Sequence, residues 1–573
     1  MSKKMLTGAE VLIKTLEKKG VEYIFGYPGG AAIPIFDALY DSPIKLILTR
    51  HEQGATHMAD GYARTTGKPG VVLVTSGPGA TNTVTGILTA KMDSVPMIVL
   101  CGQTTTPNLG KDAFQEADVF GITAPIVKHS YLVKDPDSIA RIVEESFKIA
   151  NTGRPGPVVI DLPKDVTSAP AELPLGPVEL DLPGYHIKDD INLDDVKHMA
   201  ETIAGAKRPL LLVGQGVVIS RAAKEVLAIA ELLNSPVAST LLGKGGFPET
   251  HDLSVGMLGM HGTAYANKCV EHCDLIFSIG SRWDDRIRPG DVKQFCPNAK
   301  KCHIDIDAAE VNRIVPVDAS VVGDAKRVLQ ALLPLLKPLD TEDWREQVNK
   351  WKKKHPLSYK IQGGLKAQHV IEKMYELTKG DAIVTADVGQ HQMWAAQFFR
   401  TAKPNTWLNS GGAGTMGFGF PAAIGAQFAA PKETVIAIVG DGGFQMTLCE
   451  LATAAIHKLP VKILIIDNKY LGMVRQWQSL FYEDRLSGVD LEGNPDFVKL
   501  GESYGVKGFK IKRPVDIEKV LKQALAYNDG PCVIHAEVVK EDNVFPMIPA
   551  GADASAMIID PPKRALEKPE GST

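Results

Sequence analysis

The sequence has 573 residues, 44% of them hydrophobic and 23% charged, and its formal net charge is -4. This length predicts three or four domains, and the charge balance argues against the basic surface that nucleic acids or anionic membranes require. No apolar run is long enough to span a bilayer. The first ten residues enter an amphipathic helical pattern without a signal-type segment, so we expect a cytoplasmic protein.

The seven cysteines show neither the paired spacing of metal sites nor a secreted disulfide framework. A zinc site could be drawn from His303 with Cys269, Cys273, Cys296 and Cys302, but the spacings are irregular. Reduced and mostly buried thiols are the favoured interpretation.

Residues 1–166 alternate between helical patterns and short apolar strands, several of which end in glycine-rich turns. This order is typical of a doubly wound α/β domain with a parallel sheet. The predicted strands cover residues 23–26, 45–49, 70–75, 97–101 and 158–161.

A second α/β domain is predicted for residues 190–340, after a proline-rich linker at 167–189. The turn Gly214-Gln215-Gly216 resembles a phosphate-binding loop, but it lacks the third glycine of the dinucleotide pattern and is a weak signal alone. Residues 341–364 are charged and helical, which is typical of a solvated connector. The predicted strands of this domain cover residues 210–213, 237–240, 275–279 and 302–306.

The third α/β domain, residues 365–548, contains the most informative stretch of the chain. Two apolar β-branched runs, residues 435–439 and 461–466, flank a helical pattern at 446–457. Strand, crossover helix and strand predict a parallel unit with Asp441 and Asn468 at the carboxyl ends of its strands, where open α/β sheets bind ligands. Beyond this domain, the polar residues 549–573 predict a mobile tail.

Asp441 lies in a Gly-Asp-Gly turn, and Asn468 follows Gly442 after twenty-five residues. One carboxylate and one amide carbonyl form a partial shell of hard oxygens, which suits Mg²⁺ when phosphate oxygens complete the octahedron. Each half alone is commonly structural, because Gly-Asp-Gly forms tight turns and Asp-Asn caps strands. Together they predict a magnesium-diphosphate site, and the paired motif is the one that marks thiamine-diphosphate enzymes.

Nine motifs in a fixed order carry a more specific resemblance. The sequence is similar from about residue 5 to 550 to the large, catalytic subunit of biosynthetic acetohydroxyacid synthase, also called acetolactate synthase. The motifs occupy residues 25–31 (Phe-Gly-Tyr-Pro-Gly-Gly-Ala), 50–55 (Arg-His-Glu-Gln-Gly-Ala), 75–82, 112–118, 153–158, 259–263, 388–394, 414–419 and 471–477.

The resemblance implies that thiamine diphosphate lies between the first domain of one chain and the third domain of another. A homodimer or homotetramer is therefore expected, with a possible small regulatory subunit. Glu52 is implied as the catalytic carboxyl that hydrogen-bonds the aminopyrimidine ring; the alternative is a surface glutamate favoured by the helix dipole. Mg²⁺ is expected on Asp441, Asn468 and the main-chain carbonyl of Tyr470. The implied thiamine-diphosphate positions are Glu52, Tyr27, Pro28, Gly30, Gly79, Gln390, His391, Gly414, Met416, Gly440, Asp441, Gly442, Asn468, Tyr470, Leu471, Gly472 and Met473.

The family's acceptor-selecting arginine and tryptophan match Arg286 and Trp477. A planar guanidinium suits the carboxylate of the acceptor, and a tryptophan makes a wall for a short alkyl chain. Gln103, Lys128 and Met473 match further positions of the substrate pocket. The structural alternative is that Met416 and Met473 fill the core and that Trp477 anchors a helix face.

The middle domain resembles the one that binds FAD in the biosynthetic enzymes, where the flavin is structural because acetolactate formation involves no net redox change. The segment 281–290 departs from the usual family pattern by the larger Trp283 and by one extra residue after Arg286. This leaves the path of the loop and the reach of Arg286 open. The implied FAD positions are Arg154, Gly214, Gly216, Thr240, Leu241, Met260, His261, Gly280, Arg282, Asp284, Arg286, Asp305 and Asp324.

The implied activity joins two pyruvates into 2-acetolactate, or pyruvate and 2-ketobutyrate into 2-aceto-2-hydroxybutyrate, for the biosynthesis of isoleucine, valine and leucine. One alternative is a catabolic acetolactate synthase, which needs no flavin and lacks the Arg-aromatic-Asp-Asp-Arg segment found at residues 282–286. Another is a flavin-dependent pyruvate oxidase, which would not be expected to carry Arg475-Gln476-Trp477. A non-enzymatic scaffold would be expected to have lost Glu52, Asp441 or Asn468.

Overall fold

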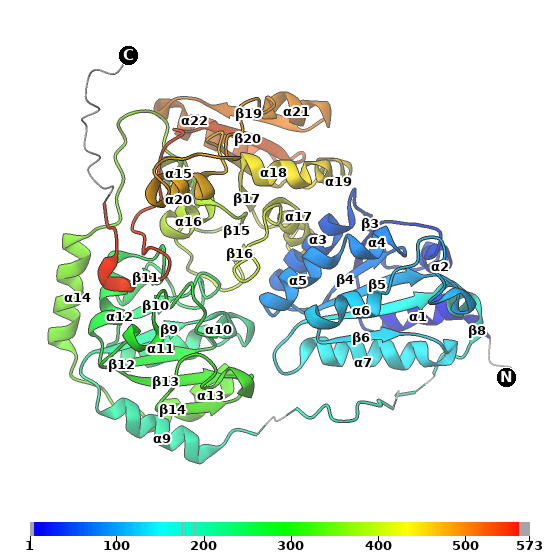
Figure 1. The fold of residues 1–573 in the computed structure, drawn as a ribbon, viewed down its shortest axis with the longest axis horizontal. Coiled ribbons are helices and arrows are strands. Elements are labelled where there is room, and N and C mark those ends of the chain that lie inside the picture. Colours follow the sequence, from blue (N-terminus) through cyan, green and yellow to red (C-terminus); the bar gives the residue numbers. More distant parts are fainter. Residues whose placement is uncertain (1–4, 175, 178, 188–189, 561–573) are drawn as a thin grey trace.

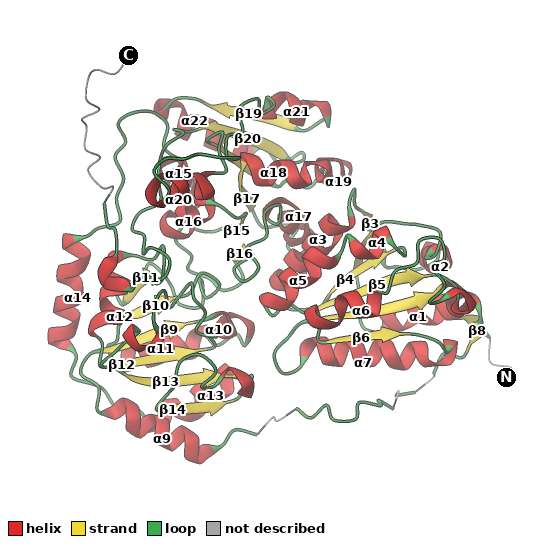
Figure 2. Cartoon of the chain, viewed as in Figure 1, coloured by secondary structure: helices red, strands yellow, loops and turns green. Residues whose placement is uncertain are grey.

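The computed structural model describes residues 5–174, 176–177, 179–187 and 190–560. These residues form three six-stranded sheets, each flanked by helices (Figures 1 and 2), and all neighbouring strands within the three sheets are parallel. The predicted doubly wound α/β fold is confirmed.

The first sheet contains all five predicted strands and one that was not predicted, β6, which lies at its edge. Its central strands are continuous apolar runs because helices cover both of their faces. In spatial order the strands are β3 (Lys45–Leu48), β2 (Tyr23–Gly26), β4 (Gly70–Val74), β5 (Met97–Gln103), β7 (Pro157–Pro163) and β6 (His129–Leu132). The helices are α1 (Gly8–Lys18), α2 (Ile33–Tyr40), α3 (Glu52–Thr66), α4 (Pro78–Thr81), α5 (Val84–Met92), α6 (Val119–Thr123), α7 (Ile139–Asn151) and α8 (Lys164–Ser168).

The second sheet contains the four predicted strands, and both of its edge strands were missed because they are short and partly polar. In spatial order the strands are β11 (Ser254–Met257), β10 (Val237–Ser239), β9 (Pro209–Val213), β12 (Leu275–Ile279), β13 (Lys300–Asp305) and β14 (Ala319–Val322). The helices are α9 (Leu193–Ala204), α10 (Gln215–Ile219), α11 (Ala223–Leu232), α12 (Ala264–His272) and α13 (Ala325–Leu332), followed by α14 (Glu342–Lys354) in the connector.

The third sheet places the two predicted strands side by side at its centre. In spatial order the strands are β16 (Trp407–Asn409), β15 (Ile383–Ala386), β17 (Val435–Gly440), β18 (Lys462–Asp467), β20 (Cys532–Glu537) and β19 (Lys507–Ile511). The helices are α15 (Ala367–Thr378), α16 (Gln390–Phe398), α17 (Gly419–Ala429), α18 (Asp441–Thr447), α19 (Leu451–Ile456), α20 (Gly472–Phe481), α21 (Phe497–Ser503) and α22 (Ile517–Ala526).

The crossover between β17 and β18 differs from the single helix predicted at 446–457. Helix α18 begins at Asp441 itself, and a 3-10 turn at Leu448–Glu450 separates it from α19. The turn places the buried carboxyl of Glu450 toward the first domain, where it accepts hydrogen bonds from the backbone of Arg50 and His51. The break in the helix therefore allows a contact between the third and first domains, made by residues that lie far apart in the sequence.

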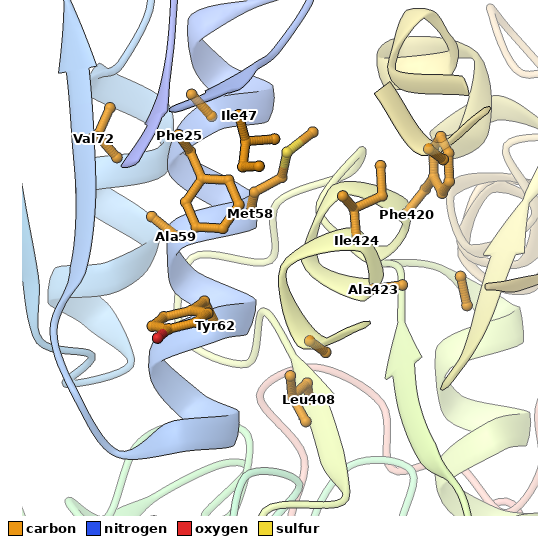
Figure 3. Packing of buried hydrophobic residues seen from close by; sticks show 14 of the residues in the cluster. Phe25, Ile47, Met58, Ala59, Tyr62, Val72, Leu408, Phe420, Ala423 and Ile424 are labelled. Atoms are coloured by element: carbon orange, nitrogen blue, oxygen red, sulfur yellow. The ribbon is translucent and has the colours of Figure 1, made fainter. Parts of the chain in front are cut away.

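The first and third domains share one hydrophobic core, in which α3 packs on α17. Figure 3 shows Met58 and Tyr62 of α3 opposite Ile424 of α17. Small residues permit the close approach, since a Cβ at Gly425 would lie 1.8 Å from the carbonyl oxygen of Met58. These two domains of one chain are thus held rigidly together.

Two boundaries differ from the prediction. Residues 167–171, assigned to the linker, still belong to the first domain, because β8 (Pro170–Ala171) pairs with β1 (Leu6–Thr7). Residues 549–560, assigned to a mobile tail, pack on the second domain, because Met547 and Ile558 form a β-bridge beside α12. The remainder of the predicted tail, residues 561–573, lies outside the described residues.

The seven cysteines are free, and six of them are buried, as expected. Among the described residues, no group of three or more His, Cys, Asp or Glu side chains could hold a metal ion, so the zinc alternative is not supported. In the same part of the chain, no helix is both long and apolar enough to cross a bilayer.

Candidate active site

A cavity of about 460 Å³ lies between the second and third domains, with a rim from the first domain. The carboxyl ends of β17 and β18 open into it from one side, and those of β12 and β13 open into it from the other. Such strand ends are the usual ligand positions of open α/β sheets. The residues predicted for thiamine diphosphate that line this cavity are Gln390, His391, Gly414, Met416, Gly440, Asp441, Gly442, Asn468, Tyr470, Leu471, Gly472 and Met473.

Asp441 is the first residue of α18, and its buried carboxyl has two polar neighbours. Asn494 donates a hydrogen bond to its Oδ2 atom at 2.7 Å, and Asp467 lies beside it. Burial, and then the charge of Asp467, raise the pKa of Asp441, while His535, at 2.8 Å from Asp467, helps to keep the pKa of Asp467 low. A buried carboxyl pair of this kind has capacity for a cation.

Asn468 follows β18 directly, and its two amide atoms have different partners. Its Nδ2 atom donates to Oε1 of Gln390 at 3.1 Å, and its Oδ1 atom accepts from the backbone N–H of Tyr470 at 3.1 Å. Lys469, between Asn468 and Tyr470, has a φ of 55°, which turns the chain sharply at the cavity wall. The three predicted magnesium ligands therefore line one cavity.

The glycines and His391 form a cradle suited to an anionic group. A Cβ at Gly440 would lie 2.7 Å from Cε1 of His391, so only glycine fits there. Burial lowers the pKa of His391 to about 3, so its imidazole is neutral near pH 7. Within the described residues, its buried Nε2 atom has no hydrogen-bond partner. Buried polar atoms are rarely unpaired, so this atom indicates a ligand.

The residues predicted for FAD gather on the second-domain side of the same cavity. Those that line it are Arg154, Gly216, Thr240, Leu241, Met260, His261, Gly280, Arg282, Asp284, Arg286, Asp305 and Asp324. Gly214 does not line the cavity. It packs closely against Gly280, and a Cβ at Gly214 would lie 2.0 Å from the carbonyl oxygen of Gly280. Arg154 binds Glu310 at 2.6 Å and Ser94 at 2.8 Å, which joins the first domain to this wall.

The residues predicted to select the acceptor lie where the two halves of the cavity meet. Met473 and Trp477 are one turn apart on α20, and Nη1 of Arg286 lies 3.4 Å from the sulfur of Met260. The unusual Trp283 is buried with its ring edge-on to Phe295. The bulky side chain therefore packs inside the domain, while Arg286 reaches the cavity.

Glu52 lies elsewhere, at the carboxyl edge of the first sheet. It is the first residue of α3, only 9% exposed, and it accepts a hydrogen bond from Asn82 at 2.9 Å. The alternative of a surface glutamate is therefore wrong. Four other predicted cofactor residues follow strands at this edge, and neither they nor Glu52 line the cavity described above; they are Tyr27, Pro28, Gly30 and Gly79.

Comparison with known proteins decides the family. The chain matches three thiamine pyrophosphate enzyme domains: the N-terminal TPP binding domain at residues 6–122, the central domain at 196–332 and the C-terminal TPP binding domain at 387–536. It is 46% identical over 569 residues to the acetolactate synthase large subunit of Haemophilus influenzae, covering 98% of this chain and 99% of that protein. The chain belongs to the acetolactate synthase large-subunit family.

Two further relatives support this assignment across nearly the full length. Acetolactate synthase isozyme 3 large subunit of Escherichia coli is 45% identical over 572 residues, covering 98% of this chain and all of that protein. A probable acetolactate synthase large subunit of Methanocaldococcus jannaschii is 49% identical over 558 residues, covering 95% and 94%. In this chain, each of the three matched ranges covers most strands of one sheet, and the strands of these sheets that lie outside them are β6, β7 and β15.

Two predicted substrate residues, Gln103 and Lys128, lie apart from each other in this chain. Gln103 ends β5 at the carboxyl edge of the first sheet, whereas Lys128 precedes β6 at the amino edge, where it donates to the carbonyl of Thr152 at 2.7 Å. Within one chain the two residues therefore lie at opposite edges of the first sheet, and neither lines the cavity described above, so their assignment to a substrate pocket stays a prediction. The lysine at the edge of Gln103 is Lys164, which follows β7.

Several residues of the acetolactate synthase site carried no local sequence signal. Asn494 contacts Asp441 from a loop, and Asp93 of the first domain accepts hydrogen bonds from the backbone of Gly411 and Gly412. The last two precede Gly414 on the loop that reaches the cavity. Only the fold brings these residues to the site, since Asp93 is more than 300 residues away from the loop it holds.

Proposed function

We propose that this chain is a biosynthetic acetohydroxyacid synthase. It joins two pyruvates into 2-acetolactate and CO₂, or pyruvate and 2-ketobutyrate into 2-aceto-2-hydroxybutyrate and CO₂, as the first common step toward branched-chain amino acids. The observation that carries the proposal is the single cavity in which Met473, Trp477 and Arg286 lie between the diphosphate-type and flavin-type walls. The names of the relatives support the same reaction.

Thiamine diphosphate and Mg²⁺ fit the third-domain wall. Asp441, Asn468 and the carbonyl of Tyr470 would hold the cation, and the neutral, unpaired Nε2 of His391 and the glycines beside it would face the diphosphate. Two protein side chains are a sparse shell, as expected for Mg²⁺ that completes its coordination with phosphate oxygens. When bound, the cofactor supplies the electron sink for decarboxylation of a 2-ketoacid.

FAD fits the chemistry of the second-domain wall, because this wall combines glycines and apolar residues with the charged side chains of Arg154, Arg282 and Asp324. The overall reaction converts two 2-ketoacids into one hydroxy-ketoacid and CO₂ without gain or loss of electrons. We therefore assign the flavin a structural role. A bound flavin would fill the space between the first and second domains next to Arg154.

The complete site requires a second chain in this proposal. Glu52 and its neighbours do not line the Asp441 cavity of their own chain, and apolar residues are exposed around both halves. Phe114, on the first domain, is 90% exposed, and Met446 and Val474, on the third domain, are also exposed. Contiguous exposed apolar side chains mark association surfaces, and we assign these residues to such a surface. We infer a homodimer or homotetramer in which Glu52 of one chain faces Asp441 of another and exchanges a proton with the bound cofactor.

The acceptor is chosen by this chain's own residues. Arg286 offers a planar pair of N–H donors for the acceptor carboxylate, and Trp477 forms a rigid wall beside its alkyl group. Met473, one turn earlier on α20, can adapt its unbranched side chain to the same surface. A filled site with these side chains around the acceptor would exclude water, which keeps the transferred two-carbon unit for the second ketoacid. Because its relatives are named large subunits, we also propose that a small regulatory subunit binds this chain.

The experiment is one purification followed by three measurements: the visible flavin spectrum, acetolactate formation with and without thiamine diphosphate and Mg²⁺, and oxygen uptake. Flavin-containing protein with cofactor-dependent acetolactate formation and no substantial oxygen uptake is expected. Full activity in colourless protein would overturn the biosynthetic assignment, and oxygen uptake with acetyl phosphate formation would indicate a pyruvate oxidase.

The shared site is tested by mixing two inactive variants, Glu52→Gln and Asp441→Ala. If each site combines Glu52 of one chain with Asp441 of another, random exchange of subunits restores about a quarter of wild-type activity, since half of the dimers then contain one intact site. A site within one chain would give no recovery.

A further inference from the structure

We propose that Gln476 is a positioning residue that sets the amide orientation of Gln390 and Asn468 and holds residues 541–548, here called the strap, against helix α20. The proposal rests on the proposed function, because it takes Asn468 as a ligand of Mg²⁺. It concerns a side chain that is fully buried and faces neither solvent nor the cavity wall.

Three side-chain amides form a relay with one direction. The Nδ2 atom of Asn468 donates to Oε1 of Gln390 at 3.1 Å, and the Nε2 atom of Gln390 donates to Oε1 of Gln476 at 2.8 Å. Each amide thus donates through its nitrogen toward the next oxygen. Turning over any one amide would place donor against donor or acceptor against acceptor.

The direction is fixed by the backbone at the far end of the relay. The N–H of Val544 donates to Oε1 of Gln476 at 2.8 Å, and Nε2 of Gln476 donates to the carbonyl of Val544 at 3.1 Å. A backbone N–H can only donate and a carbonyl can only accept, so Gln476 has one favourable orientation. Through Gln390, that orientation is passed to Asn468, where it agrees with the hydrogen bond from the N–H of Tyr470.

The consequence at the site concerns which atom Asn468 presents to a cation. Its Nδ2 atom is held by Gln390, which leaves Oδ1 on the side of Tyr470 and the cavity. A turned amide would offer its N–H groups to the cation, which is repulsive. Without Gln476, Gln390 would keep the carbonyl of Asp542, to which its Nε2 atom donates at 2.9 Å, and the hydrogen bond from Asn468, but the relay would lose its anchor at Val544.

The relay is packed directly against the helix that carries the acceptor-selecting residues. A Cβ at Gly472, the first residue of α20, would lie 2.2 Å from Oε1 of Gln390 and 2.6 Å from Nδ2 of Asn468. Gln476 lies on the same helix between Met473 and Trp477. A change in the relay therefore reaches both the cation side and the acceptor side of the cavity.

The strap extends this connection to the second domain. The N–H of Ile548 donates to the carbonyl of Met260 at 2.8 Å, and the N–H of Met260 donates to the carbonyl of Arg286 at 3.0 Å. Arg475, next to Gln476, donates to the carbonyl of Asp542 at 3.0 Å. The strap thus lies between α20 and the loop of Arg286, and both Gln476 and Gln390 join the strap to the amide relay.

The test compares Gln476→Met, which keeps the length of the side chain and removes the amide, with Gln478→Met as the matched control. Gln478 is on the same helix, but within the described part of the chain its side chain bonds only Ser487, away from the cavity. The readout is binding of Mg²⁺ in the presence of thiamine diphosphate without substrate, followed by tryptophan fluorescence. We expect Gln476→Met to weaken Mg²⁺ binding by about tenfold or more, in the range typical of residues that orient metal ligands. The control should stay within about twofold.

A second comparison separates the relay from a general loss of packing. If Gln476 acts through Gln390, the double variant Gln390→Met/Gln476→Met should bind Mg²⁺ no more weakly than Gln390→Met alone, whereas independent effects would multiply. Multiplied losses, or unchanged Mg²⁺ binding in a folded Gln476→Met protein, would overturn the proposal.

If Gln476→Met does not fold, Gln476→Glu replaces it. This variant keeps an acceptor for Gln390 and for the N–H of Val544 but loses donation to the carbonyl of Val544. We expect near wild-type Mg²⁺ binding with faster hydrogen exchange in the strap, and unchanged exchange would contradict the proposal. Wild-type protein that binds no thiamine diphosphate with Mg²⁺ would count against the proposed function instead.

Discussion

Glu450 of the third domain caps the helix whose first residue is Glu52. Its carboxylate accepts hydrogen bonds at 3.0 Å from the backbone N–H groups of Arg50 and His51, the two residues before α3. A Cβ at Gly54 would lie 2.2 Å from Oε1 of Glu450, so the carboxyl fits directly against the helix. The position of Glu52 is therefore set by the third domain of its own chain, although we propose that it serves the cavity of another.

The pH dependence of stability should reveal this buried carboxyl. Burial raises the pKa of Glu450 from 4.5 to about 7. The folded state then binds more protons than the unfolded state between these values, so the free energy of unfolding falls as the pH rises through this window. Glu450→Gln has no carboxyl to titrate and does not lose this stability. The difference in unfolding free energy between the variant and wild type should therefore shift in favour of the variant from pH 5 to pH 8, by an amount on the order of 3 kcal/mol.

Thermal unfolding midpoints of both proteins at pH 5 and pH 8 provide the measurement. Glu502→Gln, at an exposed glutamate of the same domain, is the control and should show a constant difference from wild type. A constant difference for Glu450→Gln as well would mean that this carboxyl does not change its protonation within the window.

Local patterns predicted the parts of the site that one strand-helix-strand unit builds. Asp441 and Asn468 could be placed at one edge because parallel strands end together, and this needs no knowledge of the other domains. Lys128 shows the limit of prediction from local patterns. Its assignment rested on position in the sequence, and the pattern gave no sign that β6 would lie at the sheet edge with its amino end away from Gln103.

Contacts that cross domains could not be predicted in the same way. The sequence pattern around Glu450 predicts one helix, yet the carboxyl of Glu450 binds a segment 400 residues earlier. The strap and residues 549–560 carry proline and polar residues typical of a tail. The strap is ordered by pairing with Gln476 and Met260, and residues 549–560 by the β-bridge between Ile558 and Met547. Such partners are set by the assembled fold rather than by local propensity.

Asn494 is expected to tune the cation site without contacting the cation. It donates to Oδ2 of Asp441 at 2.7 Å and to Oδ1 of Asp467 at 3.2 Å, which holds the carboxyl pair in place. Asn494→Ala should weaken Mg²⁺ binding by about 10- to 100-fold, with much of the turnover recovered at saturating Mg²⁺. The control is Asn528→Ala, because Asn528 binds Lys462 at the opposite end of β18. Equal Mg²⁺ dependence of both variants would rule out this role.

Trp477 should decide which acceptor is used rather than whether the reaction occurs. Its ring lies on the cavity wall and packs edge-on against Phe481 at 5.7 Å between centroids. Trp477→Leu leaves space that no longer fits an ethyl group closely, so the preference for 2-ketobutyrate over pyruvate should fall by about tenfold, while acetolactate formation continues. Competition between the two acceptors measures this ratio. Loss of both products in equal proportion would indicate damage to the helix, and Trp351→Leu in the connector is the control for a lost tryptophan.

The contact between α3 and α17 should tolerate no additional atoms. A Cβ at Gly425 would lie 1.8 Å from the carbonyl oxygen of Met58, and one at Gly61 would lie 2.1 Å from that of Ala422. Both clashes involve helix backbone, which cannot move aside without separating the two domains. Gly425→Ala should therefore lower stability by more than the 1–3 kcal/mol typical of overpacking, and it should also reduce activity, because α3 carries Glu52.

Gly205→Ala is the matched control, since the space around that glycine is open and its backbone suits alanine. It should leave the thermal unfolding midpoint unchanged or slightly raised. Both variants are compared by thermal unfolding and by hydrogen exchange of α3. If Gly425→Ala unfolds at the wild-type temperature with wild-type exchange in α3, the two domains are not held together by this close contact, and the fixed position of Glu52 must depend on Glu450 alone.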